Sequence, residues 1–200
     1  KLMSDLEGLA HQVDPLSRRG FFLATSAAAA AGYTLAAGPV RADAIKTDTD
    51  GLDTGDAKVK VADGEMPVYY ARPANVQNPP VIMVAMEIFG LHEYIKDVTR
   101  RMAKEGFIAF GGDYLTAKGG TPDDADKARD MIGELKAEEP VAFSQTADAA
   151  LAKLPGSNGK VGAIGFCWGG GQVNALAVAD AGLAAGVAYA VGALLKGIGG

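Results

Sequence analysis

A single cysteine stands in a glycine-rich turn and is the first candidate for chemistry. The stretch Gly165-Phe166-Cys167-Trp168-Gly169 follows a short apolar run and holds the only cysteine of the 200-residue chain. A Gly-x-nucleophile-x-Gly pattern between a strand and a helix is typical of a nucleophile elbow, which leaves no room for a Cβ at either glycine. The helix dipole favours a thiolate there, and the Trp168 amide can face a developing oxyanion. The pattern predicts that Cys167 is a nucleophile.

Composition limits the other uses of this cysteine. One cysteine cannot form an internal disulfide, and with two histidines it cannot complete a zinc site of the usual cysteine-histidine type. No G-x-G-x-x-G motif follows a strand, so the dinucleotide-binding fingerprint is absent. Cys167 is therefore either a reactive group or a small apolar side chain buried in a glycine-rich turn.

The second candidate is a carboxylate at the end of an apolar run. The run V-I-M-V-A-M, residues 81–86, is typical of a parallel strand buried on both faces, and Glu87 follows it directly. A carboxylate in that position is costly without a partner, which indicates a functional site. Alternatively, Glu87 is an exposed loop residue or a helix cap. His92 is either a pocket residue near Glu87 or the start of a solvated helix.

The elements that must position these residues alternate along the chain. Two alternating runs around Asp63-Gly64 predict a β-hairpin. Buried strands are expected at 81–86, 107–110, 160–164 and 186–191, and helices at 92–105, about 122–136, about 140–153 and from near 168 to 180. This order predicts an α/β fold with a mostly parallel sheet and helices on both faces.

The first 44 residues have the plan of an export signal. Arg18 and Arg19 precede an alanine-rich stretch, 21–37, which ends near the cleavage-like Ala42-Asp43-Ala44. This order resembles a twin-arginine signal, read by the twin-arginine export machinery, and predicts a folded protein delivered to the periplasm. A membrane anchor or a buried helix are the alternatives. We expect a polar linker at 45–56, a domain at 57–200, and no stable membrane span after cleavage.

The charge balance excludes one class of partner. The chain carries a formal net charge of −5 and shows no stripe of basic residues. A nucleic-acid partner is therefore not expected, because phosphate binding needs such a stripe.

Several motifs together resemble the dienelactone hydrolase family. The segment E-I-F-G at 87–90, the helix-like D-V-T-R-R-M-A-K-E-G-F at 97–107 and the elbow V-G-A-I-G-F-C-W-G-G-G at 161–171 occur in the family's order. The resemblance covers about 57–189. It implies an α/β-hydrolase fold, no metal or organic cofactor, and a small ester or lactone as substrate.

The resemblance also implies roles for six residues. Cys167 would be the nucleophile, and Glu87 would hydrogen-bond the resting thiol and take its proton. The backbone N–H groups of Ile88 and Trp168 would form the oxyanion hole. Gly165 and Gly169 would be the elbow glycines.

The family's triad continues with an aspartate and a histidine after the cysteine. No histidine follows Cys167 here, and Asp180 is the only later acid, at a predicted helix end too close to the elbow. We therefore expect the chain to be truncated at its carboxyl end, with an incomplete sheet, and to be inactive as given. The intact parent is expected to hydrolyse an ester or a dienelactone-type enol-lactone. A broad carboxylesterase, a peptidase on the same fold, or a non-catalytic α/β protein are the alternatives.

Overall fold

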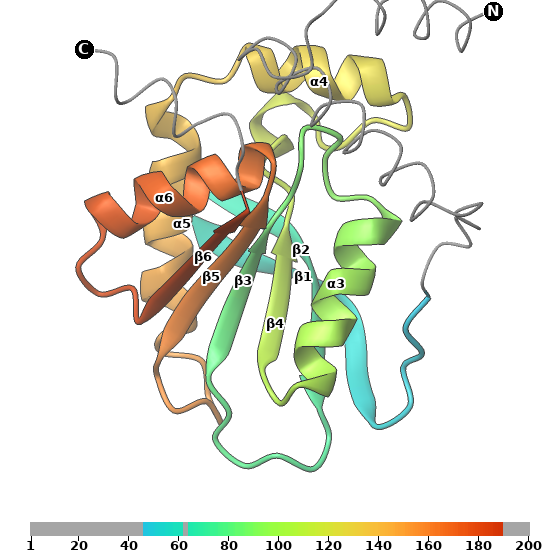
Figure 1. Cartoon of the computed structure of the whole chain (residues 1–200), viewed down its shortest axis with the longest axis vertical. Coiled ribbons are helices and arrows are strands. Elements are labelled where there is room, and N and C mark those ends of the chain that lie inside the picture. The colour runs from blue at the N-terminus through green and yellow to red at the C-terminus, as the bar shows by residue number, and fades with distance from the viewer. Residues whose placement is uncertain (1–45, 62–63, 190–200) are drawn as a thin grey trace, which may run out of the picture. The chain divides into compact units, whose positions relative to one another are not determined.

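The computed structural model describes residues 46–61 and 64–189 (Figure 1). All of them belong to one of the two units into which the chain divides, Ile45–Gly200. The predicted export signal at 1–44 lies outside the described residues, as do the hairpin turn at 62–63 and the last two positions of the strand expected at 186–191. Among the residues that are described, no helix is both long and apolar enough to span a membrane.

A six-stranded sheet forms the centre of this unit, in the order β1-β2-β4-β3-β5-β6 (Figure 1). The strands β4, β3, β5 and β6 are mutually parallel, while β1 and β2 join them as an antiparallel hairpin at one edge. Their bounds are β1 Leu52–Val61, β2 Gly64–Pro73, β3 Val81–Ala85, β4 Ile108–Gly112, β5 Val161–Phe166 and β6 Ala185–Tyr189. The predicted hairpin and mostly parallel sheet are confirmed.

The predicted linker at 45–56 is wrong from Leu52 onward, because β1 begins there. Asp53 pairs with Arg72 and Gly55 with Tyr70, so this polar stretch is a sheet edge. Most of its side chains remain exposed or half-buried, which is why an apolar pattern is missing although the strand is present.

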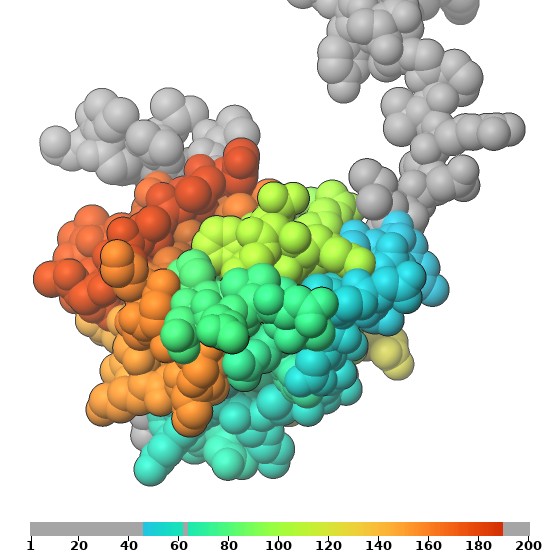
Figure 2. Space-filling model, turned by 90° about the horizontal axis from the view of Figure 1, so that it is seen from below, coloured from blue at the N-terminus to red at the C-terminus, as the bar shows by residue number. Residues whose placement is uncertain are grey.

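The residues before β1 are also attached to the fold. The Thr47 N–H donates to Asp97 Oδ1 at 2.5 Å, and Lys104 Nζ lies 2.6 Å from Asp48 Oδ1. Asp97 and Lys104 both belong to the helix α3, Glu93–Lys104, and Figure 2 shows the blue amino-terminal residues against this green helix. This segment, 46–50, is a strap docked on α3.

Helices cover both faces of the sheet, as predicted. On one face, α3 packs on β2 and β4, where a Cβ on Gly111 would meet Ile95. The strand register places Val187 on that same face, so Gly186 lies on the other, against Val173 of α6. The helix α6, Trp168–Ala179, contacts α5, Glu138–Leu151, which lies behind the sheet in Figure 1.

The remaining helices connect β4 to α5. A short 3-10 helix, Thr116–Lys118, was not predicted, and α4, Ala125–Gly133, lies within the helix expected at 122–136. These segments bring the loop around residue 121 back towards the end of β3.

The helix α3 confirms its prediction at both ends. Its N-cap is His92, and Gly106 follows its C-cap with a φ of 96°. The apolar positions Ile95 and Val98 are buried, and burying such a side chain contributes about 1.5–3 kcal/mol. The helix therefore fixes where the turn after β3 begins and ends.

Candidate active site

The strand β5 ends at Phe166, and Cys167 follows as the N-cap of α6, which starts at Trp168. Cys167 has φ 54° and ψ −118°, a conformation that few non-glycine residues adopt and that costs on the order of 1–3 kcal/mol. Its side chain is exposed, and its N–H donates to Tyr189 O at 2.9 Å. The strained turn therefore presents the thiol to solvent, so Cys167 is not a side chain buried in the turn.

The two elbow glycines are required by space. A Cβ on Gly165 would overlap the carbonyl of Gly169, and a Cβ on Gly169 would lie 2.5 Å from the carbonyl oxygens of Ala85 and Met86. The elbow thus packs directly against the end of β3, where Glu87 follows.

Glu87 and Cys167 occupy equivalent positions on neighbouring strands. The last pair of the β3–β5 register is Ala85 with Gly165, so both residues lie two positions beyond it. The carboxylate of Glu87 lies near a different residue, with Oε2 3.8 Å from His92 Nε2. Among the described residues no hydrogen bond joins Glu87 to the thiol, so the contact that the resemblance implies is not made in this conformation.

His92 fulfils both alternatives left open by the sequence. Its Nδ1 accepts a hydrogen bond from the Tyr94 N–H at 3.3 Å, which caps α3. In the neutral ring the proton then sits on Nε2, the atom facing Glu87. Nε2 is buried and has no hydrogen-bond partner among the residues that the structure describes. His92 is therefore a helix cap that also presents a donor to the site.

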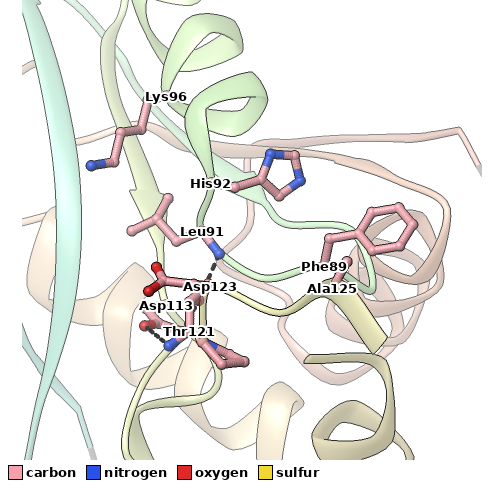
Figure 3. Close-up of a pocket in the computed structure, with 9 residues that line it drawn as sticks. Phe89, Leu91, His92, Lys96, Asp113, Thr121, Asp123 and Ala125 are labelled. Atoms are coloured by element: carbon pink, nitrogen blue, oxygen red, sulfur yellow. Dashed lines mark hydrogen bonds between the residues drawn. The ribbon is translucent and has the colours of Figure 1, made fainter. Parts of the chain in front are cut away.

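A cavity of about 640 Å³ opens beside His92 (Figure 3). It lies between the turn after β3, α3 and the segment before α4. Its lining residues are Phe89, Leu91, His92, Lys96, Asp113, Thr121, Pro122, Asp123 and Ala125. The sequence did not predict Lys96 or Thr121 as lining residues, since neither lies in a motif.

Asp113 holds the wall of this cavity in place. Its carboxylate accepts from the Thr121 N–H at 2.8 Å, from Thr121 Oγ1 at 2.9 Å and from the Leu115 N–H at 3.0 Å. Thr121 Oγ1 in turn accepts from the Leu91 N–H at 2.8 Å. These bonds tie the end of β4 to the turn that carries Glu87.

The proposed oxyanion donors lie on the two segments that meet at the elbow. Ile88 follows Glu87, and Trp168 is the first residue of α6. Among the described residues, neither backbone N–H donates to a protein acceptor, so both are free for a ligand. The Trp168 ring lies 5.7 Å from that of Tyr114 at 82°, and Tyr114 Oη is 2.9 Å from Ser144 Oγ.

Asp180 does not reach this site. It is the C-cap of α6, and Cys167 is the N-cap, so about 18 Å of helix separates them. Its Oδ1 accepts from the Gly182 N–H at 2.9 Å. Asp180 therefore closes a turn, in agreement with its exclusion from the triad on sequence grounds.

A mostly parallel sheet with a nucleophile elbow at the end of an inner strand defines the α/β-hydrolase fold. Within that fold, the chain belongs to the dienelactone hydrolase family, whose model matches residues 66–194. The resemblance noted from the elbow and the E-I-F-G segment is thereby confirmed.

Individual relatives agree with this assignment. A Methylorubrum extorquens protein named "Putative carboxymethylenebutenolidase" is 39% identical over 192 residues, which cover 93% of this chain and 64% of that protein. An Escherichia coli K12 protein of the same name is 33% identical over 144 residues, covering 70% and 53%. The chain thus spans about half to two thirds of the length of these relatives.

Two solved structures are similar to the fold. A Klebsiella pneumoniae protein titled "Putative Dienelactone Hydrolase" has a TM-score of 0.63 and 29% identity, with 70% of this chain and 60% of that chain covered. A dienelactone hydrolase-like promiscuous phosphotriesterase from metagenomic libraries has a TM-score of 0.60 and 28% identity, covering 70% and 59%.

Proposed function

We propose that the protein hydrolyses an ester or enol-lactone through a covalent intermediate on Cys167. The observation that carries the proposal is the exposed thiol in a strained turn, directly before the first residue of α6. Backbone strain of this kind clusters at active sites, where it helps to hold a reactive group in place. Cysteine is also intrinsically the most nucleophilic of the common side chains.

The reaction begins at the thiol. Glu87 rotates from His92 towards Cys167 and takes the thiol proton, and Sγ forms a bond with the substrate carbonyl carbon. The negative charge that develops on the carbonyl oxygen is held by the N–H groups of Ile88 and Trp168. The ester C–O bond then breaks, and the leaving oxygen takes the proton that Glu87 had received from the thiol. This leaves a thioester on Cys167.

Water must then hydrolyse the thioester, and this step needs a general base. The family supplies a histidine after the cysteine, whereas no histidine follows Cys167 in this chain. None of these 200 residues is proposed as that base, so the expected product of the chain is Cys167 carrying the acyl group.

Dienelactone-type lactones are the first substrate class, in keeping with the name carboxymethylenebutenolidase borne by two relatives. A broad carboxylesterase is the second candidate. It is favoured by the similarity to a structure described as a promiscuous phosphotriesterase.

Export through the twin-arginine pathway is part of the proposal. It rests on Arg18, Arg19 and the Ala42-Asp43-Ala44 site, and cleavage there would leave the strap at 46–50 intact. A reporter fused after residue 44 is expected in the periplasm, and an Arg18→Lys/Arg19→Lys double variant is expected to keep it in the cytoplasm.

The chemistry is tested with p-nitrophenyl acetate. The 200-residue chain is expected to release p-nitrophenol in a stoichiometric burst and to carry an acetyl group on Cys167 by mass spectrometry. Cys167→Ala is expected to show neither. If no burst occurs, and iodoacetamide modifies Cys167 no faster than free cysteine, the non-catalytic alternative is correct.

A further inference from the structure

The cavity beside Glu87 has the dimensions of a ligand site. Its volume of about 640 Å³ lies within the roughly 300–1,000 Å³ of small-molecule sites. Phe89, Leu91 and Pro122 supply apolar lining, and Phe89 is 39% exposed, which is unusual for a large apolar side chain. Phe89 directly follows Ile88, a proposed oxyanion donor, so the turn after β3 contributes both to the cavity wall and to the proposed oxyanion hole.

One polar atom in the cavity wall lacks a partner. His92 Nε2 is buried without a hydrogen bond and lies 3.8 Å from Glu87, beyond hydrogen-bond distance. Because Nδ1 is occupied as the cap acceptor, Nε2 carries the proton of the neutral ring. Leaving a buried donor unpaired is costly, so a turn of the imidazole that brings Nε2 into the cavity would be favoured by an uncharged oxygen acceptor on a ligand.

The negative charges around the cavity disfavour an anionic ligand. Asp113 and Asp123 line it, and Glu87 stands behind His92. The Asp113 carboxylate accepts its hydrogen bonds from Thr121 and Leu115 of its own loop, and no cation pairs with it among the described residues. Glu93, the next residue after His92, is compensated by Arg100 at 2.7 Å.

Lys96 is the one cation among the described lining residues, and it does not offset the negative charges around the cavity. Lys96 Nζ lies over the ring of Tyr69, 5.5 Å from its centroid, and 4.0 Å from Asp56 Oδ1. Figure 3 shows its side chain directed away from His92 and Phe89. Lys96 is therefore already engaged at the side of β1 and β2.

We propose that this cavity binds the flat, uncharged ring or acyl group of an ester or lactone, with His92 Nε2–H donating to one of its oxygens. It selects against substrates that carry a carboxylate on that group. The inference rests on the proposed function and narrows it. Neutral lactones and esters are preferred over carboxymethylenebutenolide, which carries such a carboxylate.

Coumarin and coumarin-3-carboxylate test this inference, since they share one lactone ring system and differ by a carboxylate. Their dissociation constants are measured by calorimetry on the full chain with Cys167→Ala, so that binding is separated from acylation. Coumarin is expected to bind at least roughly tenfold more tightly, the factor that about 1.4 kcal/mol of charge repulsion produces. The difference between the two dissociation constants is expected to shrink at higher salt, because salt screens the repulsion between the ligand carboxylate and the carboxylates of the protein.

Two variants locate the effect. Asp123→Asn is expected to tighten the binding of coumarin-3-carboxylate several-fold. Asp130→Asn, an equal charge change on exposed α4, is expected to leave that binding unchanged. His92→Asn keeps a good N-cap residue but removes the imidazole, and it is expected to weaken the binding of coumarin. Because Asp123 is exposed, its variant tests the proposal even if His92→Asn fails to fold.

Equal or tighter binding of the carboxylate overturns the inference, as does absence of binding by either compound. Unchanged affinities in both variants also overturn it. The acetylation of Cys167 by p-nitrophenyl acetate is read separately. If acetylation is intact but the ligands do not bind as expected, only this inference fails. If the ligands bind as expected but Cys167 is not acetylated, only the proposed function fails.

Discussion

The ring of Tyr114 meets the ring of Trp168 edge-on, with centroids 5.7 Å apart and planes at 82°. Tyr114 is fully enclosed, and burial raises the pKa of its hydroxyl. That hydroxyl is 2.9 Å from Ser144 Oγ, which is also 2.9 Å from Pro140 O. The residue after the nucleophile is thus held by a chain of contacts that leads into α5.

Removing the Tyr114 hydroxyl should loosen this support. Tyr114→Phe is expected to lower the free energy of unfolding by about 1 kcal/mol, because Ser144 retains its bond to Pro140 O. Trp168 is the only tryptophan, so its fluorescence reports both urea unfolding and its own environment. Tyr94→Phe, at an exposed tyrosine of α3, is the control. Equal effects of the two variants would contradict the assigned role.

The elbow glycines should not tolerate a methyl group. Gly169→Ala places a Cβ 2.5 Å from the carbonyl oxygens of Ala85 and Met86, and it is expected to cost roughly 1–3 kcal/mol and to slow acetylation of Cys167. Gly133→Ala is the matched control, because nothing lies within 4 Å of its Cβ at the end of α4. It should be neutral or stabilising by up to about 1 kcal/mol. Equal unfolding midpoints would refute the steric argument.

The elbow could be predicted from the sequence because its constraints are local. A tight turn leaves glycine at fixed offsets from Cys167, and the apolar run of β5 and the helix after it occupy adjacent positions in the chain. The same holds for α3, whose cap, apolar face and terminal glycine lie within fifteen residues of each other.

The first half of β1 and the strap could not be predicted in this way. Asp53 and Gly55 become strand residues only through pairing with Arg72 and Tyr70, partners about seventeen residues away. Thr47 meets Asp97 fifty residues along the chain. Such contacts leave no periodic pattern, because the exposed edge needs no apolar side chains.

The direction of the Glu87 side chain could not be predicted from the sequence either. The motif places the carboxylate beside the thiol, but side-chain rotation decides whether it faces Cys167 or His92. The position of Nε2 follows from the helix cap that His92 provides, and the sequence left this role as one of two alternatives.

Asp97 should make the stability of the fold sensitive to acid. Burial alone would raise the pKa of its carboxyl, but the hydrogen bond from the Thr47 N–H and the Arg101 guanidinium together hold it below its usual range. Its stabilisation is therefore fully present above the unfolded pKa, near 3.9, and is lost as the pH falls through the folded value. Urea midpoints measured from pH 7 to pH 2 are expected to show this loss.

The variant Asp97→Asn separates the contribution of Asp97 to acid sensitivity from the contributions of other carboxylates. It leaves Arg101 without its partner and should cost about 3 kcal/mol at pH 7, with a flatter acid profile. Asp126→Asn breaks an exposed pair with Arg129 and should cost less than about 1 kcal/mol. An unchanged acid profile in Asp97→Asn would show that the Asp97 carboxyl does not cause the loss of stability in acid.

Asp148 should affect the stability of the fold in the opposite direction to Asp97, because it destabilises the fold as the pH rises. It lies on α5, is 7% exposed, and its Oδ1 is buried without a hydrogen bond. Burial, with a smaller contribution from the charge of Asp180, raises the pKa of its carboxyl. Folding therefore favours the protonated form, and the ionised group destabilises the fold increasingly as the pH rises through the folded value.

Asp148→Asn removes that penalty while keeping the size of the side chain. The variant is expected to melt at a higher temperature than the natural chain at pH 7, and the advantage should vanish below about pH 4, where the natural carboxyl is protonated in both states. Asp130→Asn, an equal charge change on the exposed surface of α4, is expected to leave the melting temperature nearly unchanged. A lower melting temperature for Asp148→Asn at pH 7 would mean that the ionised carboxylate stabilises the contact between α5 and the turn after α6.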